Sequence, residues 1–162
     1  MRYLLMISLL LPAMATAEEQ RIGFVAGSTY GVGLGYSKQF KDGRGWQVSA
    51  LPIVEDDLDA TVFLGGTMFQ TLNSNTWGRA YWSLGLAAFY TRQSREEWDD
   101  EGPLLDEGVM LSFGPGVGLE RRWKQFAVSL ELPLAVQVGY NNHELVFLGM
   151  HPIPNFSLMY FW

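Results

Sequence analysis

The sequence predicts an all-β protein, an antiparallel up-and-down transmembrane β-barrel with eight strands. Three observations lead to this fold class. Large apolar residues alternate with small or polar residues over most of the chain, which is the two-residue period of a β-strand. No run approaches the roughly 18 apolar residues of a membrane helix. Only 17% of the residues are charged, against about 25% in soluble domains, while 14% are aromatic and 18 are glycine.

The first 17 residues have the organisation of a secretory signal peptide. Arg2 supplies a positive start, 3–11 is a short apolar segment, and Ala15-Thr16-Ala17 has the small-x-small form of a cleavage site. The apolar segment is too short to remain as a membrane anchor. We therefore expect 1–17 to be removed and 18–162 to form one barrel domain. The chain has no cysteine, which excludes disulfides and thiolate metal sites and is compatible with an oxidising compartment.

The expected strands follow from the alternation and from the turns between them. In order, they are 20–27, 29–40, 45–55, 60–71, 78–92, 108–121, 125–139 and 153–162. The face opposite the large residues is mostly Gly, Ala and Ser, which would make a poor solvated surface. The large residues are therefore expected to face lipid and the small ones the lumen, whereas a soluble sandwich or lipocalin would show the reverse. Closure is expected because lipid cannot satisfy an open sheet edge.

The connections between these strands alternate in kind and so predict an orientation. Short basic turns at the ends of the second, fourth and sixth strands are expected in the periplasm, and longer acidic connections at 55–59, 92–107 and 140–153 outside. Eleven of the 17 acidic residues lie in the first two of these outer connections. Aromatic girdles are expected at both interfaces, with five tryptophans near the periplasmic strand ends. Near the outer ends lie Tyr30, Tyr90 and Tyr140.

The C-terminus carries the most specific motif, Phe156-Ser157-Leu158-Met159-Tyr160-Phe161-Trp162, in which Phe156, Leu158, Tyr160 and Trp162 share one face. With this aromatic end and eight strands, 18–162 resembles the small outer-membrane β-barrels of Gram-negative bacteria, the OmpA/OmpX type, as an architecture rather than as a matched sequence. The resemblance implies that the barrel-assembly machinery reads the terminal strand. It also implies contact with outer-membrane lipid and lipopolysaccharide. The family usually ends in Phe, so Trp162 is a departure from it.

Polar residues on the lumenal face are the first candidates for a functional site. They are Glu131, Arg79, Gln137, Gln47 and Glu120. A buried carboxylate needs a partner, and we expect Arg79 to be the cation for Glu131. These residues would either plug the lumen or line a narrow conductive path. Eight strands leave an interior that side chains can fill, which favours the plug.

Two further candidates lie in the outer connections. The carboxylates of 92–107 could hold Ca²⁺ or Mg²⁺, but no EF-hand spacing is present and a solvated loop is the favoured interpretation. His143 or His151 with Glu144 could belong to the Ser–His–acid set of a lipid A acyl hydrolase or transferase. No serine lies in a recognisable nucleophile motif, and we assign no catalytic, cofactor or metal residue.

The expected function is therefore a non-enzymatic integral outer-membrane barrel with a structural, adhesive or narrow-pore role. A lipid-modifying outer-membrane enzyme is the alternative. The expected protein is a monomer, and its net charge of −6 argues against nucleic acid as a partner.

Overall fold

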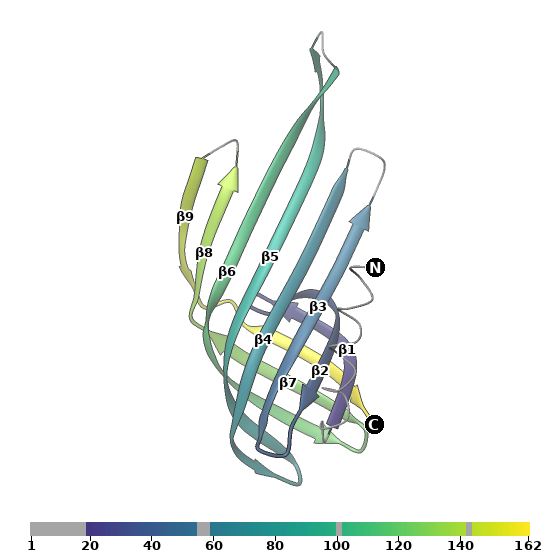
Figure 1. The fold of residues 1–162 in the computed structure, drawn as a ribbon, viewed down its shortest axis with the longest axis vertical. Helices are drawn as coiled ribbons and strands as arrows, with labels where there is room; N and C mark the ends of the chain where they lie inside the picture. The colour runs from purple at the N-terminus through teal and green to yellow at the C-terminus, as the bar shows by residue number, and fades with distance from the viewer. Residues whose placement is uncertain (1–18, 55–58, 100–101, 142–143) are drawn as a thin grey trace, which may run out of the picture.

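The computed structural model describes residues 19–54, 59–99, 102–141 and 144–162, so the predicted signal peptide lies outside the described residues. These residues form a closed, eight-stranded antiparallel up-and-down barrel, which confirms the predicted fold class (Figure 1). No helix in the part of the chain that the structure describes is long and apolar enough to cross a membrane.

Six of the eight barrel strands are continuous, and two are each interrupted once. The continuous strands are β1 (Glu19–Gly27), β2 (Gly31–Gln39), β3 (Arg44–Val54), β4 (Ala60–Asn75), β5 (Gly78–Asp99) and β6 (Gly102–Trp123). The seventh consists of β7 (Phe126–Pro133) and β8 (Ala135–Asn141), and the eighth of β9 (Glu144–His151) and β10 (Asn155–Phe161). Strands that are neighbours in the chain pair side by side, and β1 pairs with β10 to close the barrel.

The interruptions coincide with prolines. β7 and β8 pair with β6 in one register, and β9 next to its interruption continues the register of β10, so β7 and β8 are one barrel strand, as are β9 and β10. The Leu134 N–H donates to the carbonyl oxygen of Pro115 on β6 at 2.8 Å. Pro115 has no N–H with which to return the bond, so the ladder lacks one hydrogen bond at the point where β7 ends.

Two outer connections are shorter than the sequence predicts. The strands β5 and β6 continue through most of 92–107, with a register shift between Ser94 and Trp98. The strands β8 and β9 likewise continue through most of 140–153, so the eighth strand begins at Glu144 rather than at 153. Antiparallel strands pair through their backbones and need no apolar face where both sides are solvated, which is why polar composition hid the extension of β5 and β6.

The outside of the barrel is apolar and the inside is polar. Each of the eight strands presents at least one large apolar side chain that is 45–70% exposed, as shown by Phe24, Leu34, Val48, Leu64, Leu86, Leu119, Leu132 and Leu158. Among the described residues, the 16 buried polar or charged residues outnumber the eight buried apolar ones. A water-soluble barrel has the opposite arrangement, because burial of apolar surface drives its folding.

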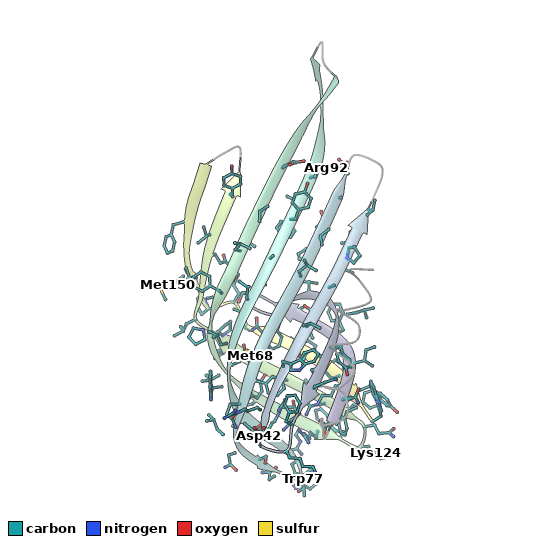
Figure 2. All side chains as sticks on the ribbon, viewed as in Figure 1. Asp42, Met68, Trp77, Arg92, Lys124 and Met150 are labelled. Carbon is teal, nitrogen blue, oxygen red and sulfur yellow. The ribbon has the colours of Figure 1, made fainter. Side chains whose placement is uncertain are left out.

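The two ends of the barrel differ. We call the end that contains Glu19, Trp162 and the turns after β2, β4 and β6 the lower end; Asp42, Trp77 and Lys124 mark it in Figure 2. The β5–β6 hairpin rises furthest at the upper end (Figure 1). The pairing of β2 with β3 stops at Leu34, and β9 pairs only with β8, so the described strands leave the upper half open between β3 and β9.

Candidate functional site inside the barrel

The turn between β1 and β2 folds into the lumen instead of projecting from the barrel. Thr29 is fully buried and Tyr30 is 4% exposed. The Tyr30 carbonyl oxygen accepts a hydrogen bond from the Ser49 hydroxyl, and the Thr29 carbonyl oxygen accepts one from the Thr67 hydroxyl at 3.3 Å. The expected place of Tyr30 in an outer aromatic girdle was therefore wrong, because the alternation of the following strand does not extend into the turn.

Two glycines on the opposite wall make room for this turn. A Cβ atom on Gly65 of β4 would lie 1.8 Å from the carbonyl oxygen of Tyr30, closer than any real contact. A Cβ atom on Gly85 of β5 would lie 2.7 Å from the Cβ of Thr29. The glycine-rich inner face therefore lets a backbone segment cross the lumen at close range.

Below the turn, a polar layer surrounds the carboxylate of Glu131, which is 1% exposed. The Tyr30 hydroxyl donates to its Oε2 at 2.8 Å, and the Asn155 side-chain amide donates to its Oε1 at 2.8 Å. The hydroxyls of Tyr30 and Tyr81 are also 2.8 Å apart. Asn155 in addition donates to the Thr29 hydroxyl at 2.6 Å, which ties the turn to the last strand.

A second, charged layer fills the lower end of the lumen. Glu120 on β6 accepts from Arg79 of β5 at 2.8 Å and from Arg122 at 2.8 Å, and it also pairs with Arg21 of β1. The Gln39 side-chain oxygen accepts from all three arginines at 2.8 to 3.2 Å. Arg21, Arg79 and Glu120 are each at most 7% exposed. Because buried charges are costly unless paired, this network holds four of the eight strands together at one level.

The pairing expected for Arg79 was wrong. Its guanidinium pairs with Glu120, and its Cζ atom lies 4.4 Å from the ring centroid of Phe69, whereas hydrogen bonds from neutral groups satisfy Glu131. Sequence reasoning missed Arg21 and Arg122 as members of the lower layer. Alternation could have indicated Arg122, because it shares an inner face with Glu120 two residues earlier.

The remaining lumenal candidates lie on the inner face but outside these two layers. Gln47 and Gln137 are each 8% exposed. Gln47 lies at the level between the layers, and its side-chain nitrogen has no hydrogen-bond partner among the described residues. Gln137 is higher, opposite Ser112 of β6.

Almost no space separates the two layers. The void between them has a volume of about 10 Å³ and is lined by Arg21, Tyr30, Gln47, Tyr81 and Glu120, among others. A cavity needs about 10–15 Å³ of this kind of volume to hold one water molecule. The described side chains therefore leave room for at most about one water molecule in this void.

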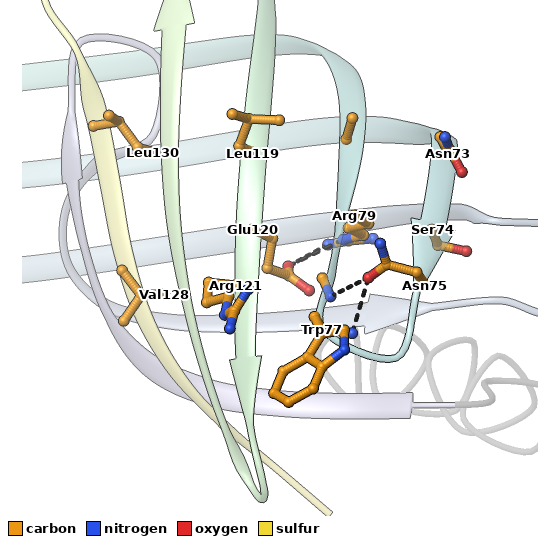
Figure 3. A pocket seen from close by; sticks show the side chains of 12 residues that line it. Asn73, Ser74, Asn75, Trp77, Arg79, Leu119, Glu120, Arg121, Val128 and Leu130 are labelled. Atoms are coloured by element: carbon orange, nitrogen blue, oxygen red, sulfur yellow. Dashed lines mark hydrogen bonds and ion pairs between the residues drawn. The ribbon is translucent and has the colours of Figure 1, made fainter.

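A larger groove of about 540 Å³ lies near the lower end, where the outward-facing side chains of Leu119, Val128 and Leu130 meet polar residues of the β4–β5 turn (Figure 3). The Arg121 guanidinium carbon is 5.0 Å from the ring centroid of Trp77. The Asn75 side chain accepts hydrogen bonds from the backbone of Trp77 and of Gly78, which fixes the turn. This groove contains an apolar wall and a cationic edge but no cluster of catalytic groups.

The loop candidates lie partly outside the described residues. His143 lies outside the described residues, as do several of the loop carboxylates, and His151 and Glu144 are placed only as backbone positions in β9. The described residues contain no group of three or more His, Cys, Asp or Glu side chains arranged to hold a metal ion. Comparisons with family models, with curated proteins and with solved structures find no match for this chain.

Proposed function

We propose that this chain is an integral β-barrel of the bacterial outer membrane with a plugged lumen and a structural or adhesive role. The observation that carries the proposal is the inverted distribution of side chains: an apolar exterior around a polar interior. Lipid is the solvent in which such an exterior is stable, and a barrel is the β-structure that can cross it.

The aromatic residues support an orientation with the lower end in the periplasm. Trp77, Trp123 and Trp162 lie at or beyond strand ends there and are 50–62% exposed. Indole rings are favoured at the headgroup level of a bilayer, and short turns are typical of the periplasmic end. In this orientation the hairpin tips face outward, where lipopolysaccharide would be the neighbouring molecule.

The plug argues for a structural or adhesive role over a narrow pore. An ion that crossed the lumen would have to displace the turn at 28–30 and disrupt the charged layer around Glu120. Separating those buried ion pairs is costly. The β5–β6 hairpin, which rises furthest, would be the part of the barrel that makes adhesive contacts or contacts lipopolysaccharide.

Cell fractionation tests the location, and conductance tests the role. We expect the protein in the outer-membrane fraction as a heat-modifiable, monomeric species that floats with lipid vesicles after refolding. Purified protein in a planar bilayer should give no stable channel steps. A soluble periplasmic product would contradict the membrane location, whereas membrane insertion with regular conductance steps would contradict only the plugged lumen.

A further inference from the structure

A separate cavity of about 280 Å³ lies in the upper half of the barrel, above the turn that crosses the lumen. Gly27, Ser28 and Gly31 of that turn and its flanks form part of its wall, so the plug is also its floor. Its volume is nearly twice that of a cavity of about 150 Å³ that binds benzene in a protein core. The cavity is therefore large enough for a small organic molecule.

The walls of this cavity are largely apolar. The rings of Phe63 and Phe89 contact each other with their centroids 4.8 Å apart and their planes tilted by 43°, on the inner faces of neighbouring strands. The apolar side chains that line the cavity are Val32, Phe63, Ala87, Ala88, Phe89, Met110 and Ile153. Among the described residues, no charged side chain lines it. The charged layer at the lower end, by contrast, contains five charged side chains, so the two halves of the lumen suit different chemistry.

One polar group in this cavity has no partner. Ser112 of β6 is one of the wall residues and is 2% exposed, and its hydroxyl oxygen is buried and makes no hydrogen bond to any described residue. A buried hydroxyl without a partner costs free energy, because water no longer solvates it. A ligand with a hydrogen-bonding atom at this depth would satisfy it.

The cavity lies beside the open side of the barrel. Ser28 and Ile153 both line the cavity. They also lie at the bottom of the gap between the upper parts of β3 and β9, two described strands that do not pair with each other. The Ser28 hydroxyl donates to the Ile153 carbonyl oxygen at 3.1 Å and closes this rim below the cavity. An elongated molecule could therefore enter from the side without disturbing the plug.

We propose that this cavity binds an unbranched alkyl chain that carries one neutral hydrogen-bonding group, such as an alcohol or an ester carbonyl. The aromatic and aliphatic walls would hold the chain, and Ser112 would bond the polar group. A carboxylate is disfavoured because none of the described lining residues is a cation that would compensate its burial. Binding of such a chain does not depend on the proposed membrane location. Only the source of the ligand rests on that proposal, because the ligand is either a bilayer lipid or a free molecule.

Cysteine protection provides a test, because the natural chain has no cysteine. Ala87→Cys places a thiol in the cavity wall, and Thr91→Cys places one on the same face of β5 above the cavity. The rate of alkylation by iodoacetamide is measured in a fluorinated surfactant, with and without 1-decanol, and in phosphatidylcholine vesicles without added ligand. Heat-modifiability first establishes that each variant is folded, and Met110→Cys is the second reporter in the wall.

We expect decanol to slow alkylation at position 87 at least severalfold while leaving position 91 unchanged. Slow alkylation in vesicles without decanol would identify bilayer lipid as the source, and protection by decanol alone would identify a free molecule. Equal rates with and without decanol at both wall positions in folded protein, together with no slowing in vesicles, would overturn the proposal. Equal slowing at positions 87 and 91 would also overturn it, because it would show surface adsorption. Failure of the membrane proposal appears separately, as failure to float with vesicles.

The role of Ser112 is tested by its replacement in the Ala87→Cys background. Ser112→Ala removes the unpartnered hydroxyl and should raise the decanol concentration for half-protection by roughly two- to tenfold, the effect of one lost hydrogen bond. Half-protection by decane, which has no polar group, should stay within twofold. An unchanged decanol response in Ser112→Ala would overturn the assignment of this serine.

Discussion

At the scale of single residues, Glu120 is the centre of the lower lumen, because its two oxygens accept from three arginines on three strands. Glu120→Gln keeps the shape but removes the charge, which leaves buried guanidinium groups with too few anions. We expect a loss of about 3–5 kcal/mol in the free energy of unfolding. The denaturant midpoint of protein refolded into vesicles measures this loss.

The matched control for this change is Glu107→Gln on the same strand. Glu107 is exposed near the upper end, so the same substitution there should change stability by less than about 0.5 kcal/mol. Equal midpoints for Glu120→Gln and Glu107→Gln would show that the charged layer does not stabilise the barrel.

At the scale of elements, the inward turn between β1 and β2 depends on a missing side chain on β4. Gly65→Ala would place its Cβ against the Tyr30 carbonyl oxygen, so the turn or the strand must move. Overpacking of this kind costs about 1–3 kcal/mol. Gly66→Ala is the control, because a Cβ on Gly66 has no other atom within 4 Å.

Thermal loss of heat-modifiability compares the two glycine variants. We expect a lower midpoint for Gly65→Ala and no decrease for Gly66→Ala. Equal midpoints for the two would mean that the turn does not cross the lumen at this point.

The sequence predicted the strands and their two faces better than the contacts within the lumen. Alternation alone places Glu131, Glu120 and Arg79 on the inner face, where the structure has them. Contacts between inner side chains depend on the offset in register between neighbouring strands. The shear of the barrel sets this offset, and no local sequence signal reveals it. For this reason the partner of Arg79 could not be read from its position in the chain.

The turn at Tyr30 was unpredictable for a different reason. Its place inside the barrel depends on contacts with Ser49, Thr67 and Gly65, all of which are distant in sequence. Nothing in the turn itself distinguishes an inward from an outward conformation. The upper extensions of β5 and β6 were missed because these parts of the strands rise above the apolar exterior of the barrel. There they need no alternation of apolar and polar residues.

At the scale of the whole molecule, the apolar exterior predicts how the barrel responds to its solvent. Leu132 on β7 is 55% exposed at mid-height, and Leu72 is 64% exposed near the lower end of β4. In a bilayer, Leu132→Arg should cost about 2–4 kcal/mol and Leu72→Arg about 0–1 kcal/mol, because the cost of a charge falls toward the interface. Unfolding in vesicles by denaturant measures both. If Leu132→Arg and Leu72→Arg both left the free energy of unfolding unchanged, the result would indicate that water and not lipid surrounds the barrel.

The closing strand joins the fold of the molecule to its assembly. Residues 160–162 pair with β1, and the backbone N–H groups of Phe161 and Trp162 donate to Gln125 and Gln20 at 2.9 and 3.3 Å. Tyr160 and Trp162 face outward with their rings stacked, whereas Phe161 lies against the arginines of the lower layer. The strand could therefore act through barrel closure, through recognition of its outer face during assembly, or through both.

Removal of residues 160–162 should lower the amount of heat-modifiable barrel in the outer membrane and leave export intact, because the seam with β1 loses its lower pairings. Two point variants separate the causes. Phe161→Ala should reduce stability in vesicles, since it loses its contacts with Arg21 and Arg122. Trp162→Ala should refold normally in vesicles but accumulate poorly in cells if assembly factors read the outer face. Normal outer-membrane levels of the truncated chain would contradict both roles, because a frayed terminus that neither closes the barrel nor guides its assembly is dispensable.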